Sequence, residues 1–409
     1  MSAQARSAQS SKMPITGKLA ARAGRPTILH VCAHLDPGDP ARETVDLAVL
    51  TQRSGWRSLI ASSGGLLVPE AERAAVQHTR MPLGKDSLWA GWRNRIRLSA
   101  LIQKERPVLV HAHGIKVAEH ALNASRNLQL PLVVDITAPP PDNAHAHRLM
   151  KRLSRTHSSI RVPSEFMAHY IIDTFKWPPQ ELNVIPTGID LQWNNPGIVS
   201  AERLQALSKL WRLPEQSTVI VMPMPFIPGG GHRQLLEALT KVGRSDIFIV
   251  LVGDNRPAAG CREEIEKMVT EYRLDGKVIM PDFCLDWPAA CWLANIVAAT
   301  NTAPRGQGFE LIVAQAIGRP VIVTDCGANK EMVQDGNTAW IVPPDDVTAL
   351  TKALAEAINL DTAKRLDLAK RTRDFVAESF PHVNWFNSTM ELYDTLLQPP
   401  ARHSRAAAA

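Results

Sequence analysis

The sequence predicts an α/β protein with two domains, each built around a doubly wound parallel sheet. Short apolar runs rich in β-branched residues alternate with longer stretches of helical periodicity, which is typical of β-α-β units. The alternation pauses between Ile189 and Pro214, a segment with proline and glycine at Pro196 and Gly197, and begins again at Thr218. Two sheets in series, joined by a hinge, therefore account for most of the 409 residues.

The strands of both sheets are expected at apolar runs, with helices between them. The first series is Thr27–Ala33, Arg57–Ser62, Pro107–Ala112, Pro131–Ile136 and Ser158–Val162, with helices such as Ala41–Arg53 and Trp89–Glu105. The second series is Thr218–Met222, Asp246–Val252, Lys277–Met280, Asn295–Ala299, Pro320–Thr324 and Trp340–Val342. We divide the chain into an N-terminal domain (27–190), a hinge (191–214), a C-terminal domain (215–380) and a closing helix (381–397).

The two ends of the chain lack the pattern of a folded core. Residues 1–26 are small, polar and basic and contain no apolar stretch, so we expect a disordered arm and not a secretory signal. Residues 398–409, QPPARHSRAAAA, are expected to form a disordered tail. No run approaches the ~18 apolar residues that a spanning helix needs.

Composition indicates an ordinary globular protein of a reducing compartment. Apolar residues make up 45% and charged residues 21% of the chain, and the net charge is +6. That charge suits either solubility or attraction to an anionic surface. The five cysteines contain no CxxC pair, which argues against a disulfide framework or a zinc site. We predict a cytoplasmic protein, at most peripheral to the inner membrane, and expect no nucleic-acid partner.

Ligands of open parallel sheets bind beyond the carboxyl ends of the strands. The loops at those ends are therefore expected to face one cleft between the two domains. They are Ala33–Glu43, Ala112–Lys116, Thr137–Asn143, Pro223–His232, Pro281–Leu285 (with Phe283 as a candidate ligand contact) and Thr302–Glu310.

Several motifs resemble the family 4 glycosyltransferases, closest to bacterial enzymes of lipopolysaccharide and capsule synthesis. The resemblance covers about residues 27–395 and is carried by segments such as Val184–Asp190, Ser164–Phe166 and Ala314–Val321. It implies the GT-B fold, in which two Rossmann-like domains face across a cleft and the last helix packs back on the first domain. It also implies a nucleotide-sugar donor, a glycolipid or polysaccharide acceptor, and no metal or other cofactor.

The chain departs from this family where the donor sugar is held. Family members carry two glutamates there, and alignment through Ala314–Val321 puts Arg305 and Val313 at those positions. A valine accepts no hydrogen bond from a hydroxyl. The family's histidine near the transferred sugar is replaced by Thr137, which does not titrate near neutral pH.

The cations that grip the donor diphosphate in the family are absent as well. Pro225 stands at the family arginine and Gly230 at the family lysine. The triplet Gly229, Gly230 and Gly231 precedes a helix, so its backbone N–H groups would suit an anion. A flexible turn is the alternative reading of the same three residues.

The other donor-binding candidates are a glycine, an arginine loop and a glutamate. Gly38 remains from the family's Gly-Gly turn, where backbone approaches the donor phosphate. Arg305 lies next to Gly306 and near Gly308, so it is either a phosphate ligand or a surface arginine. Glu331 matches a family glutamate whose expected role is to fix its own loop.

Two further patterns leave alternatives open. The segment 89–102 places Trp89 and Trp92 near Arg93, Arg95 and Arg97, which suits either a cover helix or contact with anionic lipid. The histidine pairs His111/His113 and His145/His147 suggest metal binding, but each pair needs a third ligand, and we expect no metal site.

These patterns leave two hypotheses for function. The first is a divergent family 4 glycosyltransferase that moves a sugar from a nucleotide-sugar donor to an envelope glycolipid or polysaccharide. The second is a non-catalytic relative that binds a glycan, a nucleotide or a partner enzyme. Binding of a nucleotide sugar, or its absence, separates them.

Overall fold

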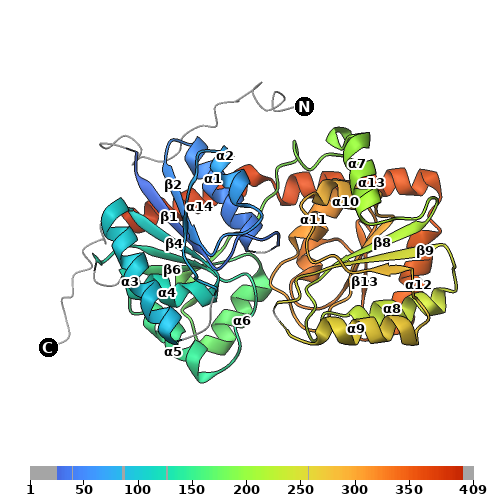
Figure 1. Ribbon diagram of the computed structural model, residues 1–409, viewed down its shortest axis with the longest axis horizontal. Coiled ribbons are helices and arrows are strands. Elements are labelled where there is room, and N and C mark those ends of the chain that lie inside the picture. The colour runs from blue at the N-terminus through green and yellow to red at the C-terminus, as the bar shows by residue number, and fades with distance from the viewer. Residues whose placement is uncertain (1–24, 39, 85–87, 126–127, 257, 399–409) are drawn as a thin grey trace.

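The computed structural model describes residues 25–38, 40–84, 88–125, 128–256 and 258–398. The predicted arm and tail lie outside these residues, except for Arg25, Pro26 and Gln398. The described chain forms two parallel sheets, as predicted. A seven-stranded sheet has the order β3-β2-β1-β4-β5-β6-β7, and a six-stranded sheet has the order β10-β9-β8-β11-β12-β13. The two sheets lie side by side with helices on their faces (Figure 1).

The first sheet and its helices come from the first half of the chain. In order they are β1 (Thr27–Cys32), α1 (Ala41–Arg53), β2 (Arg57–Ser62), α2 (Val68–Arg73), β3 (Gln77–Arg80), α3 (Leu88–Glu105), β4 (Leu109–His113), α4 (Ile115–Ser125), β5 (Leu132–Asp135), α5 (Ala144–Leu153), β6 (Ser158–Val162), α6 (Glu165–Phe175), the 3-10 turn η2 (Pro179–Glu181) and β7 (Leu182–Val184).

The second sheet begins after a short connection. The elements are η3 (Pro196–Ile198), α7 (Ala201–Leu210), β8 (Thr218–Pro223), α8 (His232–Val242), β9 (Ile247–Val252), α9 (Cys261–Glu271), β10 (Val278–Ile279), α10 (Trp287–Leu293), β11 (Ile296–Ala299), α11 (Phe309–Ala316), β12 (Val321–Thr324), η4 (Asn329–Met332), β13 (Ala339–Val342) and α12 (Val347–Ile358). Then come α13 (Thr362–Ser379) and α14 (His382–Leu397).

Most of the predicted strands are central strands that the structure buries on both faces, although the predicted β10 and β13 are edge strands and only partly buried. Every residue of β9, for example, is buried, since helices cover both sides of the sheet. The sequence did not predict β3 or β7. These strands lie at the two edges of the first sheet, and none of their residues is fully buried, so their sequences QHTR and LNV carry no continuous apolar run.

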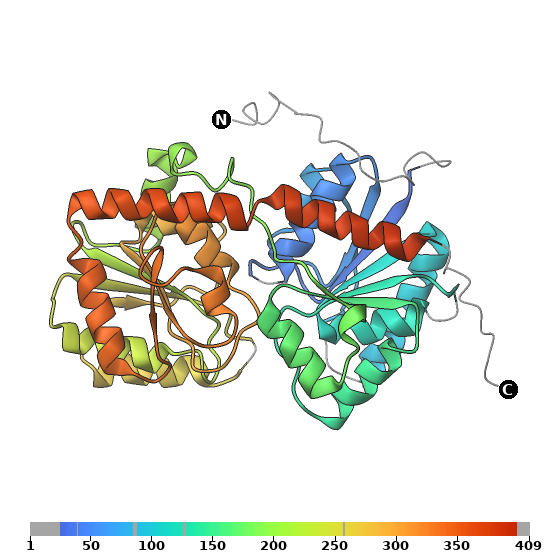
Figure 2. The same cartoon turned by 180° about the vertical axis from the view of Figure 1, so that it is seen from behind.

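The last two helices span both domains. Phe380, at the end of α13, belongs to a core of the second domain. Beyond Pro381, α14 places Trp385, Phe386 and Tyr393 in a core of the first domain. Figure 2 shows these helices in red, one over each domain. The chain thus returns to the first domain, as the resemblance implied.

Candidate functional site

The loops at the carboxyl ends of the two sheets meet between the domains. The loop after β11 (residues 300–308) lies against the loop after β5 and the start of α6. Ser164 of the first domain donates its hydroxyl hydrogen to Gly306 O at 2.7 Å. A Cβ on Gly306 would stand 2.3 Å from Thr137 O, so only glycine allows this approach. Thr137 therefore contacts the loop that contains Arg305 through its backbone oxygen.

Backbone N–H groups gather where this loop enters α11. Within the described residues, none of the amides from Gly306 to Glu310 has a hydrogen-bond acceptor, and Gly308 provides no side-chain cap. All of these residues are buried except Phe309, which is half-buried. Buried N–H groups in folded proteins are nearly always paired, and a helix N-terminus attracts negative charge. The row of amides is therefore suited to an anion.

Gln307 fixes this loop to the first domain, which the sequence did not predict. Its side-chain oxygen accepts from Thr187 Oγ1 at 2.9 Å, and its side-chain nitrogen lies 3.4 Å from Glu43 Oε2. Glu43 is paired with Arg161, and both side chains are only 1% exposed. The polar end of Gln307 thus lies in a buried, charged part of the first domain.

Glu331 makes a second contact between the domains. Its two carboxylate oxygens accept from the backbone N–H groups of Glu165 and Phe166, at 2.8 and 2.7 Å. These amides lie in the first turn of α6, where a carboxylate is favourable. The carboxylate thus links its loop to the first domain.

Arg305 and Val313 differ in their surroundings. The Arg305 side chain is half-buried, and its Nη1 lies 3.4 Å from Pro223 O at the end of β8. Val313 is fully buried in a core of the second domain. Val313 is therefore a packing residue in this structure, whereas Arg305 lies beside the strand end that precedes the glycine triplet.

Close packing accounts for two glycines of the triplet. Gly231 has φ +86°, and a Cβ on it would stand 1.9 Å from Thr300 O. A Cβ on Gly229 would stand 2.5 Å from Ala303 Cβ. The triplet lies in a turn, and its glycines let the loop before α8 lie directly on the loop after β11. Gly230 belongs to the same turn, its N–H donating to Ile227 O at 3.1 Å. An anion at these amides stays a prediction.

Phe283 lines a surface cavity of about 610 Å³ at the ends of β9 and β10. Asp254, Arg256 and Arg262 also line the cavity. Arg256 lies over the Phe283 ring, with its guanidinium carbon 5.2 Å from the ring centroid. In the first domain, Gly38 O accepts from Arg42 N at 3.0 Å before α1, and neighbouring Asp39 lies outside the described residues.

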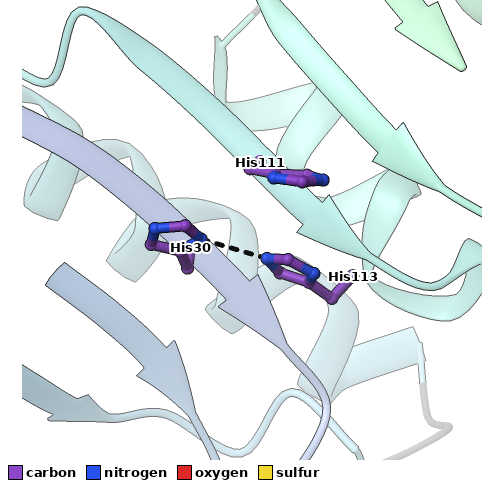
Figure 3. Close-up of side chains that lie close together, drawn as sticks. All are labelled: His30, His111 and His113. Carbon is purple, nitrogen blue, oxygen red and sulfur yellow. Dashed lines mark hydrogen bonds between the residues drawn. The ribbon is translucent and has the colours of Figure 1, made fainter. Parts of the chain in front are cut away.

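Three histidines lie together on the neighbouring strands β1 and β4 (Figure 3). His30 of β1 joins His111 and His113 of β4, and one nitrogen of each lies within 4.8 Å of the others. Their ring planes are inclined by only 24°, 31° and 38°, however. A metal ion needs a free lone pair from each ring, whereas both nitrogens of His111 and of His113 already have protein partners. The geometry therefore favours a hydrogen-bonded stack.

The contacts of the stack support this reading. His30 Nδ1 lies 3.0 Å from His113 Nε2, and His111 Nδ1 lies 2.6 Å from the Tyr393 hydroxyl. The other nitrogens of His111 and His113 lie 2.9 and 3.0 Å from the carboxylate of Asp135. The second predicted pair does not converge, because His145 faces Glu119 and His147 faces Asp142.

Burial and neighbouring charges set the protonation states of His113 and Asp135 in this network. Burial, and then the neighbouring His111, lower the pKa of His113 to about 4, so its ring is neutral at pH 7. Burial alone would raise the pKa of Asp135, but His111 and Arg161 outweigh it and hold this pKa well below its usual value. Asp135 is therefore ionised beside the neutral ring of His113, and Arg161, with Nη1 3.5 Å from Oδ2, provides a positive charge.

Two Rossmann-like domains that face across a cleft define the GT-B class of glycosyltransferases. Residues 41–193 match the family model Glycosyltransferase Family 4, and residues 217–359 match Glycosyl transferases group 1. The chain belongs to glycosyltransferase family 4.

Relatives and solved structures agree with this assignment. WcaL of Salmonella typhimurium, a glycosyltransferase named provisionally for colanic acid biosynthesis, is 29% identical over 28% of this chain and 30% of its own. The MMP alpha-(1->4)-mannosyltransferase of Mycolicibacterium hassiacum is 25% identical over 52% of this chain and 48% of its own. These matches span less than two thirds of either relative. The structure of Anabaena HepE with UDP and glucose superposes with a TM-score of 0.77 at 19% identity, covering 91% of this chain and all of HepE.

Proposed function

We propose that this protein transfers a sugar from a nucleotide-sugar donor to an envelope glycolipid or polysaccharide, using a donor site rebuilt from backbone amides. The observation that carries the proposal is the row of N–H groups from Gly306 to Glu310 without acceptors. The leaving group of such a transfer is a nucleoside diphosphate. Amides fixed in advance stabilise the charge that develops on it.

The site retains backbone groups where the family's side chains are missing. The positions of Arg305, Val313 and Thr137 lack the family's carboxylates and imidazole, and Pro225 and Gly230 lack its cations. Arg305 is the cation of the loop itself, and we propose that it contacts the donor phosphates beside Gly306 and Gly308. Metal-free transfer follows from this proposal, so activity should persist in EDTA.

We further propose that α3 brings the protein to an anionic membrane surface that carries the acceptor. Trp92 is 58% exposed and Ile96 is 49% exposed, one turn apart on the helix. Arg93, Arg95 and Arg97 are exposed beside them, whereas Leu98 is fully buried under the same helix. The Trp89 side chain lies outside the described part. No described helix is both long and apolar enough to cross a bilayer.

A non-catalytic relative is the second candidate, and one observation favours it. Gln307 and Glu331 both lie beside the expected donor position, and their side chains form contacts between the domains. A cleft fixed in this way suits a protein that presents a rigid surface to a partner. Binding of a nucleotide sugar separates the two candidates.

The test removes one amide and leaves the rest of the site in place. Phe309 is the first residue of α11, where proline is tolerated because no helical N–H bond is lost. Phe309→Pro deletes the N–H, and Phe309→Ala is the matched control that loses the ring but keeps the N–H. Calorimetry with UDP- and GDP-sugars should show about 10-fold or greater weakening in Phe309→Pro relative to Phe309→Ala, the loss of one charged hydrogen bond.

Each other result decides against a part of the proposal. Equal affinities of the two variants would show that the amide row is not the phosphate site. Absence of binding to every donor by the unaltered protein would favour the non-catalytic candidate.

A further inference from the structure

Arg256 joins the two domains at the cavity that Phe283 lines. Its Nη1 lies 2.6 Å from Asp36 Oδ2 in the loop after β1. Within its own loop, Nη2 lies 2.7 Å from Asp254 Oδ2. The guanidinium also lies 5.2 Å from the Phe283 ring centroid. Two carboxylates and an aromatic ring therefore fix this group, although its side chain is still 49% exposed.

The loop that carries Arg256 packs on the segment in which Pro225 stands at the position of the family arginine. A Cβ on Gly253 would stand 2.0 Å from Met224 O and 2.9 Å from Pro225 Cα. Phe226 N donates to Asp254 O at 3.1 Å. The loop after β9 thus contacts both neighbours of Pro225, the residue at the position of the family arginine. A guanidinium from this loop is close to the place left by that arginine.

Asp36, the partner of Arg256 in the first domain, also lies near the expected position of the diphosphate. Asp36 is two residues before Gly38, in the loop whose backbone approaches the donor phosphate in the family. A guanidinium that contacts Asp36 therefore stands between the two loops that would enclose a diphosphate. Arginine binds phosphate in the same bidentate manner as carboxylate.

We propose that Arg256 replaces the missing family arginine as a ligand of the donor diphosphate, and that Asp36 occupies this guanidinium until the diphosphate displaces it. The inference rests on the proposed function, since it names a residue of that same donor site. No covalent bond is made or broken in the exchange. One anion leaves a cation, and another takes its place.

The surroundings of Asp36 allow this exchange. A partly exposed ion pair contributes little to stability, so its separation is inexpensive. The Asp36 carboxylate keeps other partners, because Oδ1 accepts from Leu66 N at 3.1 Å and His34 Nδ1 lies 4.0 Å from Oδ2. Within the described residues, that buried His34 nitrogen has no hydrogen-bond partner, so in the tautomer that carries its proton on Nδ1 it offers the released carboxylate a second donor.

A permanent ion pair that only holds the domains together is the competing explanation. The domains are already linked by Ser164 with Gly306, by Gln307 with Thr187, and by Glu331 with α6. Those contacts are buried or part-buried, or cap a helix, whereas Arg256 lies at an open cavity beside Arg262. Its exposure is what a ligand contact needs.

The experiment measures binding of UDP, GDP and inorganic pyrophosphate by calorimetry. The variants are Arg256→Ala, Arg256→Lys and Asp36→Asn. Arg244→Ala is the matched control, because Arg244 is 41% exposed and pairs with Asp246 before β9, at the other end of that strand. We expect Arg256→Ala to weaken each ligand about 10-fold or more. Asp36→Asn should bind them as well as or better than the unaltered protein, Arg256→Lys should be intermediate, and Arg244→Ala should be unchanged.

The results distinguish this inference from the proposed function. Unchanged affinity in Arg256→Ala, with clear binding by the unaltered protein, would overturn the inference alone. Equal losses in Arg256→Ala and Asp36→Asn would identify a domain link and also overturn it. No binding of UDP, GDP or pyrophosphate by the unaltered protein would overturn the proposed function and the inference together.

Discussion

Arg161→Met should destabilise the first domain more than any exchange of a surface arginine. Arg161 is 1% exposed, pairs with Glu43, and donates to Ile185 O at 2.9 and 2.6 Å and to Thr187 Oγ1 at 2.9 Å. Methionine fills similar space but leaves two buried carboxylates, those of Glu43 and Asp135, without their cation. Breaking a buried pair in this way costs about 3–5 kcal/mol.

The cost should depend on pH with a defined sign. Burial already raises the pKa of Glu43 against the opposing effect of Arg161, so loss of the arginine raises it further. A carboxyl whose pKa is higher in the folded state than in the unfolded state loses stability as pH rises through the folded value. The penalty of Arg161→Met should therefore be larger at pH 8 than at pH 5.

Urea denaturation at both pH values, followed by circular dichroism, measures this penalty. With a slope of about 2 kcal/mol per molar urea, the midpoint should fall by about 1.5–2.5 M at pH 8. Arg152→Met is the control, since Arg152 is 38% exposed and pairs with Glu119 at 2.8 Å. Its cost should stay under about 1 kcal/mol. Equal costs for the two variants, or a penalty that does not change with pH, would refute the reasoning.

Three further predictions concern other parts of the molecule. Tyr393→Phe removes the hydroxyl 2.6 Å from His111 Nδ1 and should lower the free energy of unfolding by about 1–3 kcal/mol in a denaturant titration; an unchanged midpoint would contradict the contact. Val313→Glu buries a carboxylate in a core position, so it should lower the melting temperature without creating transferase activity, and turnover gained by this variant would disprove that several positions failed together. Cys261 is half-buried and the other cysteines are buried, so a thiol reagent should modify Cys261 first. Burial and then Glu264 raise its pKa, so this reaction should accelerate as pH rises, and faster labelling elsewhere would contradict the burial.

The sequence was sufficient for the central strands because burial on both faces leaves continuous apolar runs. Arg57–Ser62 and Ser158–Val162, for instance, have the predicted bounds. The edge strands β3 and β7 were missed because their exposed or half-buried residues form no apolar run, whereas the edge strands β10 and β13 kept one and were predicted. The overall arrangement of the domains followed from motifs shared with the family and not from periodicity.

The candidate site was predictable as a set of loops but not as a set of contacts. The predicted strand ends define which loops lie at the site, and the contact between Gly306 and Thr137 joins two of those loops. Pairs distant in sequence could not be predicted: Arg256 and Asp36 are 220 positions apart, and Gln307 and Glu43 are 264 apart. The local sequence around one residue does not indicate a partner so distant in the chain. His30 was missed likewise, since only the topology places β1 beside β4.

The path of α14 has a consequence for the order in which the protein is assembled. Trp385, Phe386 and Tyr393 complete a core whose other members include Ile28 and Trp56, although most of the second domain separates them in the chain. During synthesis the first domain emerges long before these side chains do, and it must wait with that face uncovered. A fragment cut at the hinge would keep the same exposed face and leave His111 without its tyrosine. The first domain therefore needs α14, from the other end of the chain, to complete its core.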